Sequence, residues 1–211
     1  MKISPSILDA DFLHLQGEVD SIGNADRIHL DIMDGKYVPS TTIRASDLLN
    51  IAFPIETEAH LMCDNPETFF KEFVDLGVKG ITFHIENTGE KEALRLLKEL
   101  KEKGIRGGIC IDGYTEPDTL SDDVLHTAGQ ILVMSVKAGK GGQSFMTESL
   151  DKIMTLRERG YEGEIEVDGG INLDNVKLLR EAGADIVVVG SFVMKKPTEE
   201  RCKVIEKFQK V

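Results

Sequence analysis

Short apolar runs alternate with longer amphipathic segments along the whole chain. The apolar runs are rich in isoleucine, valine and leucine, which is typical of strands buried on both faces of a parallel sheet. The pattern predicts eight strands, near residues 2–8, 27–32, 55–62, 79–85, 106–111, 129–136, 163–167 and 185–190.

The segments between these runs carry helix signals. The clearest helix is predicted over 65–76, where Asn65 can act as the cap and Pro66 occupies the first helical position. A second strong helix is predicted over 90–103. Further predicted caps are Thr147, Asn172 and Thr198, the last opening a terminal helix through Phe208. Glycines are expected at helix ends at Gly77, Gly104, Gly160 and Gly183.

Strands and helices alternate strictly in eight units of about 25 residues, which fits a single-domain α/β protein with the parallel (β/α)8 TIM-barrel fold. The 211 residues are enough for one well-buried domain, so residues 1–211 are expected to form one barrel. An open doubly wound sheet is the alternative. The barrel is favoured because polar side chains and glycine-rich turns follow the strands, where such barrels build their sites.

Four polar side chains stand at or near strand ends: His29, Asp31, His60 and Asp168. His29 and Asp31 are two residues apart, so the period of a strand puts both on one face. In a barrel all four point inward at one end. Two imidazoles and two carboxylates there make both a metal site and an acid/base pair. One such residue alone is more often structural, but four together favour a functional site.

Glycine-rich turns follow the last three predicted strands, at 139–143, 169–170 and 190–191. Backbone N–H groups approach an anion closely where the residues are glycines, and helix N-termini add a favourable dipole. Turns at the last strand ends also match the usual phosphate corner of this barrel. The sequence therefore predicts a ligand that carries a phosphate group.

Three methionines, Met33, Met62 and Met134, follow or end predicted strands. Two interpretations stay open: packing in the core, or an apolar pocket lid that keeps water from a reactive intermediate. His84 ends the fourth predicted strand, and whether it lines the pocket is left open. The other two histidines, expected on the surface, are His14 and His126.

Composition excludes several classes. A hydrophobic fraction of 41% with 29% charged residues is typical of a soluble globular protein. No apolar run approaches the roughly 20 residues that span a bilayer, and no secretory signal is visible, so we expect a cytoplasmic protein without a membrane segment. The net charge of −12 argues against nucleic acid or anionic membranes as partners. Three cysteines without C-x-x-C spacing predict reduced thiols.

Longer motifs run nearly from end to end of the chain: Ser4-Pro-Ser-Ile-Leu8, His29-Leu-Asp-Ile-Met-Asp-Gly35 with Val38-Pro39, His60-Leu-Met62, Val133-Met-Ser135, Gly141-Gly-Gln-Ser-Phe145, Glu166-Val-Asp-Gly-Gly170 and Gly190-Ser191. Through these motifs, which are highly specific together, the chain resembles the ribulose-phosphate 3-epimerase family. The resemblance implies a catalytic barrel, a phosphorylated ketose as the small-molecule substrate, and a homo-oligomer.

The resemblance also implies roles for individual residues. One divalent metal ion per chain (zinc, iron, manganese or cobalt) would be held by His29, Asp31, His60 and Asp168, with the two aspartates as the acid/base pair. Ser6 and His60 would contact the sugar. The remaining implied substrate contacts are the turn of Gly139, Lys140, Gly141 and Gly142 and the phosphate site of Gly169, Gly170, Gly190 and Ser191.

The expected chemistry agrees with these roles. Inverting a carbon next to a ketone requires removing a proton from one face and returning one to the other, so Asp31 and Asp168 must lie on opposite sides of the substrate. A metal would act as a Lewis acid for the enediolate. We therefore expect an isomerase, a ketose-phosphate 3-epimerase, with D-ribulose 5-phosphate to D-xylulose 5-phosphate as the leading reaction.

Three segments depart from the family pattern. The chain has Asp112-Gly-Tyr-Thr115 in place of Asn-Pro-x-Thr, Lys137-Ala-Gly-Lys140 in place of Asn or Asp with Pro-Gly-Phe, and Ser40-Thr-Thr-Ile43 in place of Asn-Leu-Thr and glycine. Lys137 and Lys140 either add charge near the phosphate or are solvated loop residues. The departures leave the metal and acid/base set intact but leave the substrate open.

Other functions stay as alternatives. D-allulose 6-phosphate is the closest alternative substrate. Decarboxylases of related barrels use an Asp-x-Lys-x-x-Asp strand end, whereas this chain has Asp31-Ile-Met-Asp34 without a lysine, which disfavours decarboxylation. A non-catalytic barrel that binds a phosphate ligand is the alternative from a different class, and the presence of all four metal and acid/base candidates argues against it.

Overall fold

The computed structural model describes all residues 1–211 and contains one sheet of eight parallel strands. The strands are β1 (Lys2–Pro5), β2 (Ile28–Met33), β3 (Thr57–Met62), β4 (Gly80–His84), β5 (Arg106–Ile111), β6 (Gln130–Met134), β7 (Glu164–Asp168) and β8 (Ile186–Val189). All eight predicted strands are thus confirmed. The largest difference is at β1, which ends early because the Ser6 side chain caps a 3-10 turn over Ile7–Asp9.

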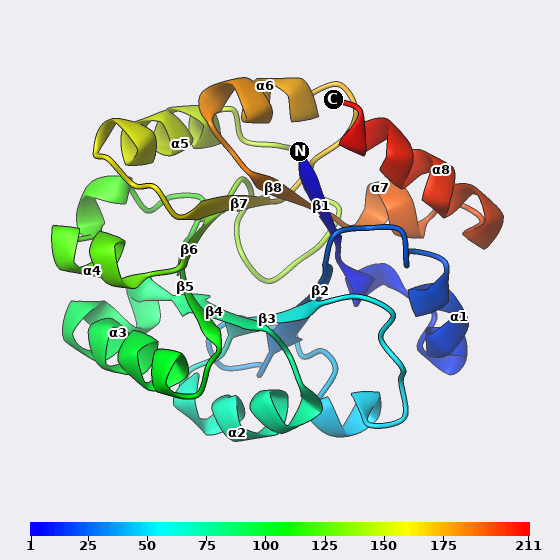
Figure 1. The fold of residues 1–211 in the computed structure, drawn as a ribbon, viewed down its shortest axis with the longest axis horizontal. Helices are drawn as coiled ribbons and strands as arrows, with labels where there is room; N and C mark the ends of the chain where they lie inside the picture. The colour runs from blue at the N-terminus through cyan, green and yellow to red at the C-terminus, as the bar shows by residue number, and fades with distance from the viewer.

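The strands form a barrel (Figure 1). Their order is β1-β8-β7-β6-β5-β4-β3-β2, and a parallel bridge between Ser6 and His29 joins the two ends of the sheet. An open doubly wound sheet would instead show a reversal of strand order. The TIM-barrel prediction is therefore confirmed, and the open-sheet alternative is wrong.

Helices surround the ring of strands (Figure 1). They are α1 (Leu15–Asp20), α2 (Glu67–Leu76), α3 (Ile85–Glu102), α4 (Asp122–Thr127), α5 (Glu148–Glu158), α6 (Val176–Ala182), α7 (Ser191–Met194) and α8 (Thr198–Gln209). The glycines predicted at helix ends all have positive φ, as at Gly77 (93°) and Gly183 (109°). No helix is both long and apolar enough to cross a membrane.

The strict alternation fails in one unit. Between β2 and β3 the chain forms no α-helix, only a 3-10 turn over Ala45–Leu48. Pro39 and Pro54 bracket this segment, and the β-branched run 41–43 lowers its helix propensity. The chain still has eight α-helices, because both α7 and α8 follow β8.

Helix starts were predicted less well than helix ends. Helix α2 begins at Glu67 after Pro66. The carbonyl oxygen of Asn65, rather than its side chain, accepts a hydrogen bond from the backbone nitrogen of Thr68. Thr147 precedes α5 but its side chain makes no capping bond. Helix α3 begins at Ile85, earlier than predicted, because Gly89 with φ of 66° joins a first turn to the long amphipathic part.

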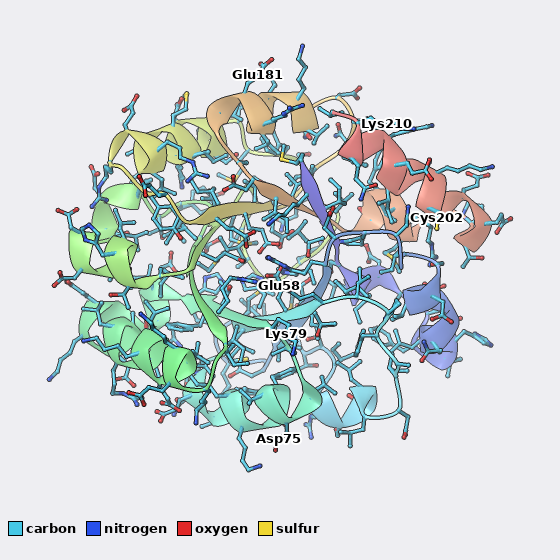
Figure 2. All side chains as sticks on the ribbon, in the orientation of Figure 1. Glu58, Asp75, Lys79, Glu181, Cys202 and Lys210 are labelled. Atoms are coloured by element: carbon cyan, nitrogen blue, oxygen red, sulfur yellow. The ribbon has the colours of Figure 1, made fainter.

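Alternation along the strands separates the core from the barrel interior. In β2, Ile28, Leu30 and Ile32 belong to the main hydrophobic core between the sheet and the helices. The residues between them, beginning with His29 and Asp31, face the barrel axis, as the period of two requires. Other strands also send polar side chains inward, and Glu58 lies inside the ring of strands (Figure 2).

The remaining histidines and the cysteines lie as predicted. His14 and His126 are exposed. The three cysteines are free, and no disulfide is present. These residues therefore need no further functional explanation, apart from Cys110, which is buried near the site described below.

Candidate active site

The four predicted strand-end residues meet at one end of the barrel. His29 and Asp31 come from β2, His60 from β3 and Asp168 from β7. One ligand atom from each lies within 4.8 Å of all the others, and all four side chains are largely buried. Asp31 and His60 are direct partners in the β2–β3 ladder, so the strand register itself brings them together. This set is suited to hold a metal ion.

His29 carries the orphan atom of this cluster. Its Nδ1 lies 3.2 Å from Glu58 Oε1, and its Nε2 has no hydrogen-bond partner although the side chain is fully buried. A buried polar nitrogen without a partner is costly unless something else binds it. A carboxylate on one imidazole nitrogen with the other free is the usual arrangement of a metal-binding histidine. The donor set therefore fits a divalent cation.

His60 presents its two nitrogens to different neighbours. Nδ1 lies 3.3 Å from Asp31 Oδ1, and Nε2 lies 2.9 Å from His84 Nε2. Burial lowers the pKa of His60 to about 4, although the hydrogen bond with Asp31 acts to raise it. The imidazole is therefore neutral at physiological pH, the form that can ligate a metal. His84 is buried but does not line the pocket, which settles the alternative left open above.

The two aspartates titrate in opposite directions. Burial would raise the pKa of Asp31, but the neighbouring His29, with Nε2 3.5 Å from Asp31 Oδ1, and the contact with His60 hold it far below its usual range. Burial and the negative charge of Asp31 raise the pKa of Asp168 to about 7. Ser6 Oγ donates a hydrogen bond of 2.5 Å to Asp31 Oδ2. Neighbouring carboxyl groups with separated pKa values are the pattern of an acid/base pair.

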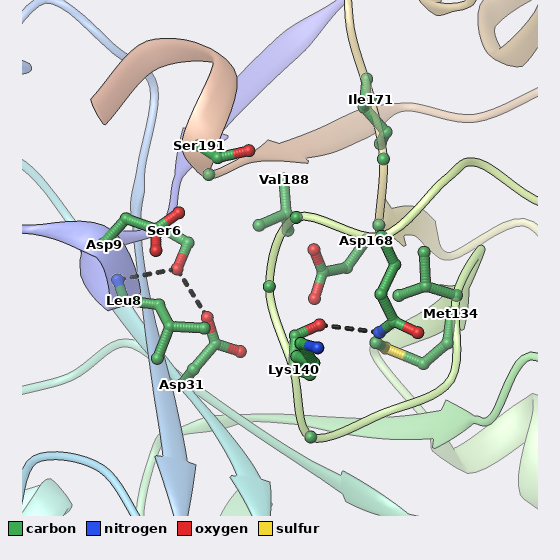
Figure 3. A pocket seen from close by; sticks show the side chains of 18 of the residues that line it. Ser6, Leu8, Asp9, Asp31, Met134, Lys140, Asp168, Ile171, Val188 and Ser191 are labelled. Carbon is green, nitrogen blue, oxygen red and sulfur yellow. Dashed lines mark hydrogen bonds between the residues drawn. The ribbon is translucent and has the colours of Figure 1, made fainter. Parts of the chain in front are cut away.

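A pocket of about 270 Å³ opens above these carboxylates. Asp31 and Asp168 point into it from different sides, and Ser191 stands at its rim (Figure 3). The predicted substrate-contact residues that line it are Ser6, Gly139, Lys140, Gly141, Gly142, Gly169, Gly170, Gly190 and Ser191. Its apolar wall includes Met33, Met62 and Met134. The histidines His29 and His60 lie beneath the pocket rather than in its lining.

The glycine turns bring backbone close to backbone at the pocket. Gly170 has φ of 64°, and a Cβ atom there would lie 2.5 Å from the backbone nitrogen of Phe145, so only glycine fits. The Gln143 side chain donates to the carbonyl oxygens of Lys137 and Lys140, each at 2.7 Å, and so holds the neighbouring turn. Lys140 lines the pocket, whereas Lys137 is exposed and does not.

The three segments that depart from the family pattern are joined to one another. Ser40 Oγ donates to the carbonyl oxygen of Gly139 at 2.9 Å. Asp112 Oδ1 accepts from the backbone nitrogen of Ala138 at 3.0 Å. The changes in these segments therefore meet at residues 138 and 139, where the chain enters the 139–142 turn of the pocket.

Sequence reasoning missed several residues of the site. Asp9, Val136, Asn172 and Phe192 also line the pocket. Each follows a strand within a few residues. They could therefore have been predicted from the rule that such barrels build their sites after the strands. The sequence reasoning also did not single out Glu58 or Glu166, which lie beneath His29. The strand period that placed His29 and Asp31 inward applies to them as well.

Glu58 and Glu166 form a buried carboxyl pair below the site. Gln130 Nε2 donates to Glu58 Oε2 at 3.2 Å and to Glu166 Oε2 at 2.5 Å, and Arg27 also donates to Glu58 at 2.8 Å. Burial and the charge of Glu58 raise the pKa of Glu166 to about 8. Glu166 is therefore protonated in the folded protein where an unfolded chain would ionise it.

This proton makes stability depend on pH. The folded pKa of Glu166 lies above the unfolded value of about 4.3, so its contribution is present at low pH and is lost as pH rises toward 8. Since one pKa unit corresponds to about 1.4 kcal/mol, we expect Glu166→Gln to raise the free energy of unfolding by roughly 1 to 3 kcal/mol at pH 8.5 and little at pH 5. The measurement is urea unfolding of chelator-treated protein at both pH values.

The matched control is Glu162→Gln, because Glu162 is exposed on the approach to the same strand. It should leave both unfolding curves within error of the parent protein. An equal effect of Glu166→Gln at the two pH values would show that Glu166 is not protonated on folding.

Comparison with known proteins agrees with this geometry. The model of the ribulose-phosphate 3 epimerase family matches residues 2–194. A ribulose-phosphate 3-epimerase from Helicobacter pylori strain J99 is 38% identical over all of this chain and 98% of its own length. One from a Synechocystis strain is also 38% identical, over 92% of this chain and 88% of the relative. One from Mycobacterium leprae is 37% identical, over 90% and 87%.

Solved structures support the fold. A 3-hexulose-6-phosphate synthase superposes with a TM-score of 0.73 at 12% identity, covering 100% of this chain and 99% of the other. Phosphoribosyl anthranilate isomerase from Thermotoga maritima gives 0.67 at 17% identity, covering 100% and 97%. At such identities only the barrel is shared.

The sequence relatives decide the class of protein. They are named as ribulose-phosphate 3-epimerases, and the match covers most of their length. Epimerases are isomerases, so the expectation of an isomerase is confirmed. The chain belongs to the ribulose-phosphate 3-epimerase family.

Proposed function

We propose that residues 1–211 form a metal-dependent ketose-phosphate 3-epimerase whose preferred reaction interconverts D-ribulose 5-phosphate and D-xylulose 5-phosphate. The observation that carries the proposal is the convergence of Asp31 and Asp168, from β2 and β7, on one pocket bordered by glycine turns. The choice of ribulose 5-phosphate as substrate rests on the relatives, which are named as ribulose-phosphate 3-epimerases.

The two aspartates exchange the proton of carbon 3. One carboxylate removes it from one face of the substrate, and the other carboxyl returns a proton to the opposite face, with the roles reversed in the other direction. Asp31 and Asp168 enter the pocket from β2 and β7, so one can act as the base while the other acts as the acid. The Ser6 hydroxyl, hydrogen bonded to Asp31, orients that carboxylate for the transfer.

One divalent metal ion (zinc, iron, manganese or cobalt) would be held by His29, Asp31, His60 and Asp168. As a Lewis acid it supplies stabilisation of the negative charge that develops on the enediolate. The unpartnered Nε2 of His29 supports this assignment. Mixed imidazole and carboxylate ligands suit these metals better than soft ones.

The rim of the pocket would hold the rest of the substrate. The phosphate group is assigned to Gly169, Gly170, Gly190 and Ser191, where Ser191 begins α7. The 139–142 turn and Ser6 would lie against the sugar, and Lys140 would add a positive charge at the mouth. Met33, Met62 and Met134 would exclude water from the enediolate.

The proposal extends to location and assembly. A rice relative is named as a cytoplasmic isoform, which supports a cytoplasmic location for this chain. Assembly into a homo-oligomer rests on the family resemblance. Neither nucleic acid nor a membrane surface is proposed as a partner, in keeping with the net charge of −12.

The reaction is tested in deuterium oxide. Xylulose 5-phosphate formed from ribulose 5-phosphate is expected to carry deuterium at carbon 3, because the carboxyl proton returned to the substrate exchanges with solvent. The same assay with allulose 6-phosphate tests the alternative suggested by the joined loop departures. We expect it to react about 10- to 200-fold less efficiently, the range in which a pocket discriminates one extra carbon group.

The outcomes separate the functions. Higher catalytic efficiency on allulose 6-phosphate would overturn the five-carbon assignment and keep the epimerase. No label from either ketose phosphate, together with tight binding of one of them, would point to the non-catalytic barrel.

A further inference from the structure

His84 lies directly behind the proposed metal ligand His60. Its Nε2 is 2.9 Å from His60 Nε2, and the ring centroids lie 5.1 Å apart with the planes at 20°, so the two rings meet edge to edge. Both side chains are buried, so no water competes for either nitrogen. A short contact between two imidazole nitrogens is a hydrogen bond only if one carries a proton and the other a lone pair.

The metal site decides which nitrogen carries the proton. In the proposed function His60 offers Nδ1 to the cation, because that atom faces Asp31 at 3.3 Å. A ligating nitrogen has no proton, so His60 Nε2 must carry one and donate it to His84 Nε2. His84 must then carry its own proton on Nδ1. That atom lies 3.3 Å from Glu86 Oε2, which can accept it.

We propose that Glu86 and His84 act as positioning residues, which hold His60 in the tautomer and orientation that presents Nδ1 to the divalent metal. This inference rests on the proposed metal site. Under this proposal the two histidine ligands are held in place in different ways. His29 is held directly by the Glu58 carboxylate, whereas His60 is held by a carboxylate acting through a second imidazole.

Glu86 is itself held from both sides. Oε2 faces His84, and Oε1 accepts a hydrogen bond of 2.7 Å from the backbone nitrogen of Asp112. Burial acts to raise the pKa of Glu86, but these hydrogen bonds lower it to about 2, so the group is a carboxylate at neutral pH. Its side chain is 25% exposed, and its position is therefore set by these contacts rather than by burial alone.

A second metal site is the competing reading of the same atoms. His60, His84 and Cys110 also have ligand atoms within 4.8 Å of one another. Two nitrogens bound to one tetrahedral zinc at 2.0–2.1 Å would lie about 3.3 Å apart. The observed 2.9 Å instead matches a hydrogen bond.

The test measures metal affinity, not activity. Purified, chelator-treated protein is titrated with Co²⁺, and binding is followed by the visible absorption of the bound ion. His84→Phe keeps an aromatic ring but removes the acceptor, and we expect it to weaken Co²⁺ binding about 10- to 100-fold, as for other groups that hold a metal ligand. His84→Gln places an amide oxygen near the Nε2 position and should recover most of that loss.

Control variants separate positioning from folding. Glu90→Gln removes an exposed glutamate of the same helix, α3, and His126→Phe removes an exposed histidine; both should bind Co²⁺ like the parent protein. Unchanged affinity in His84→Phe would overturn the proposal, and so would an equal loss in His84→Gln. If the parent protein bound no metal at all, the metal-dependent function would fail instead.

A second measurement does not depend on the His84 variants folding. Nitrogen-15 NMR of the zinc-loaded parent protein should show His60 protonated at Nε2 and His84 protonated at Nδ1. The reverse tautomer of either ring, or binding of a second equivalent of zinc that removes both ring protons, would overturn the assignment. Glu86→Gln should lower Co²⁺ affinity by about tenfold, less than the largest losses at such positions.

Discussion

Replacing Asp31 or Asp168 by asparagine is expected to lower kcat for epimerisation by about 10²- to 10⁴-fold, the usual contribution of a positioned acid or base. Asparagine keeps the shape and one oxygen but cannot carry the proton of carbon 3. The loss should appear with either aspartate because each serves one face of the substrate. The measurement is steady-state conversion in both directions.

The two variants should also differ from each other. Each retains one working carboxyl group, so each should still exchange the carbon-3 proton of one epimer with deuterium oxide while failing to invert it. Asp31→Asn and Asp168→Asn are then expected to exchange opposite epimers. Such complementary behaviour is specific to two bases that reach the substrate from different sides. Figure 3 shows that the Asp31 and Asp168 carboxylates enter the pocket from different places.

Controls distinguish proton transfer from metal loss. Metal content must be measured for both variants, because the same side chains are proposed ligands. Asp174→Asn changes an exposed aspartate after β7 and should be fully active. Near-normal turnover in either site variant would contradict the two-carboxylate mechanism.

Replacing Lys152 by methionine should produce the largest loss of stability. Lys152 is buried in α5, and its Nζ donates to the carbonyl oxygens of Gly113 at 2.6 Å and Thr115 at 2.8 Å, with that of Asp112 at 3.4 Å. Methionine fills similar space but leaves these acceptors without their donor. We expect a loss of about 2 to 4 kcal/mol in the free energy of unfolding.

Thermal unfolding should show this as a decrease in Tm of about 5 to 15 °C. Lys98→Met, at an exposed position of α3, is the matched control and should leave Tm unchanged. An unchanged Tm in Lys152→Met would mean that water replaces the lysine ammonium in the 112–115 loop. The same loop donates to Glu86, so metal affinity of the variant reports whether its backbone has moved.

Local patterns predicted much of the fold. Eight apolar runs predicted eight strands, and glycines at 77, 104, 160 and 183 marked helix ends because they alone adopt positive φ easily. The missing helix between β2 and β3 shows the limit. The connection between β2 and β3 contains only a 3-10 turn, because its prolines and β-branched residues disfavour an α-helix.

Helix starts depended on local backbone detail, and site details depended on contacts between distant residues. Asn65 has the right type for a cap, but its carbonyl oxygen rather than its side chain accepts the N–H of Thr68. Because His84 ends a strand, the sequence left open whether it lines the pocket. In the structure it turns behind His60, away from the cavity.

The sequence by itself determined which side chains face the barrel interior, because the period of a strand puts His29 with Asp31 on one face, and glycine turns follow the strands whatever their neighbours are. Only the tertiary structure decided which side chains meet. The ladder between β2 and β3 pairs His29 with Glu58 and Asp31 with His60, and the turn after β4 sets Glu86 against His84. These pairs depend on strand register and barrel closure, which no local stretch of sequence specifies.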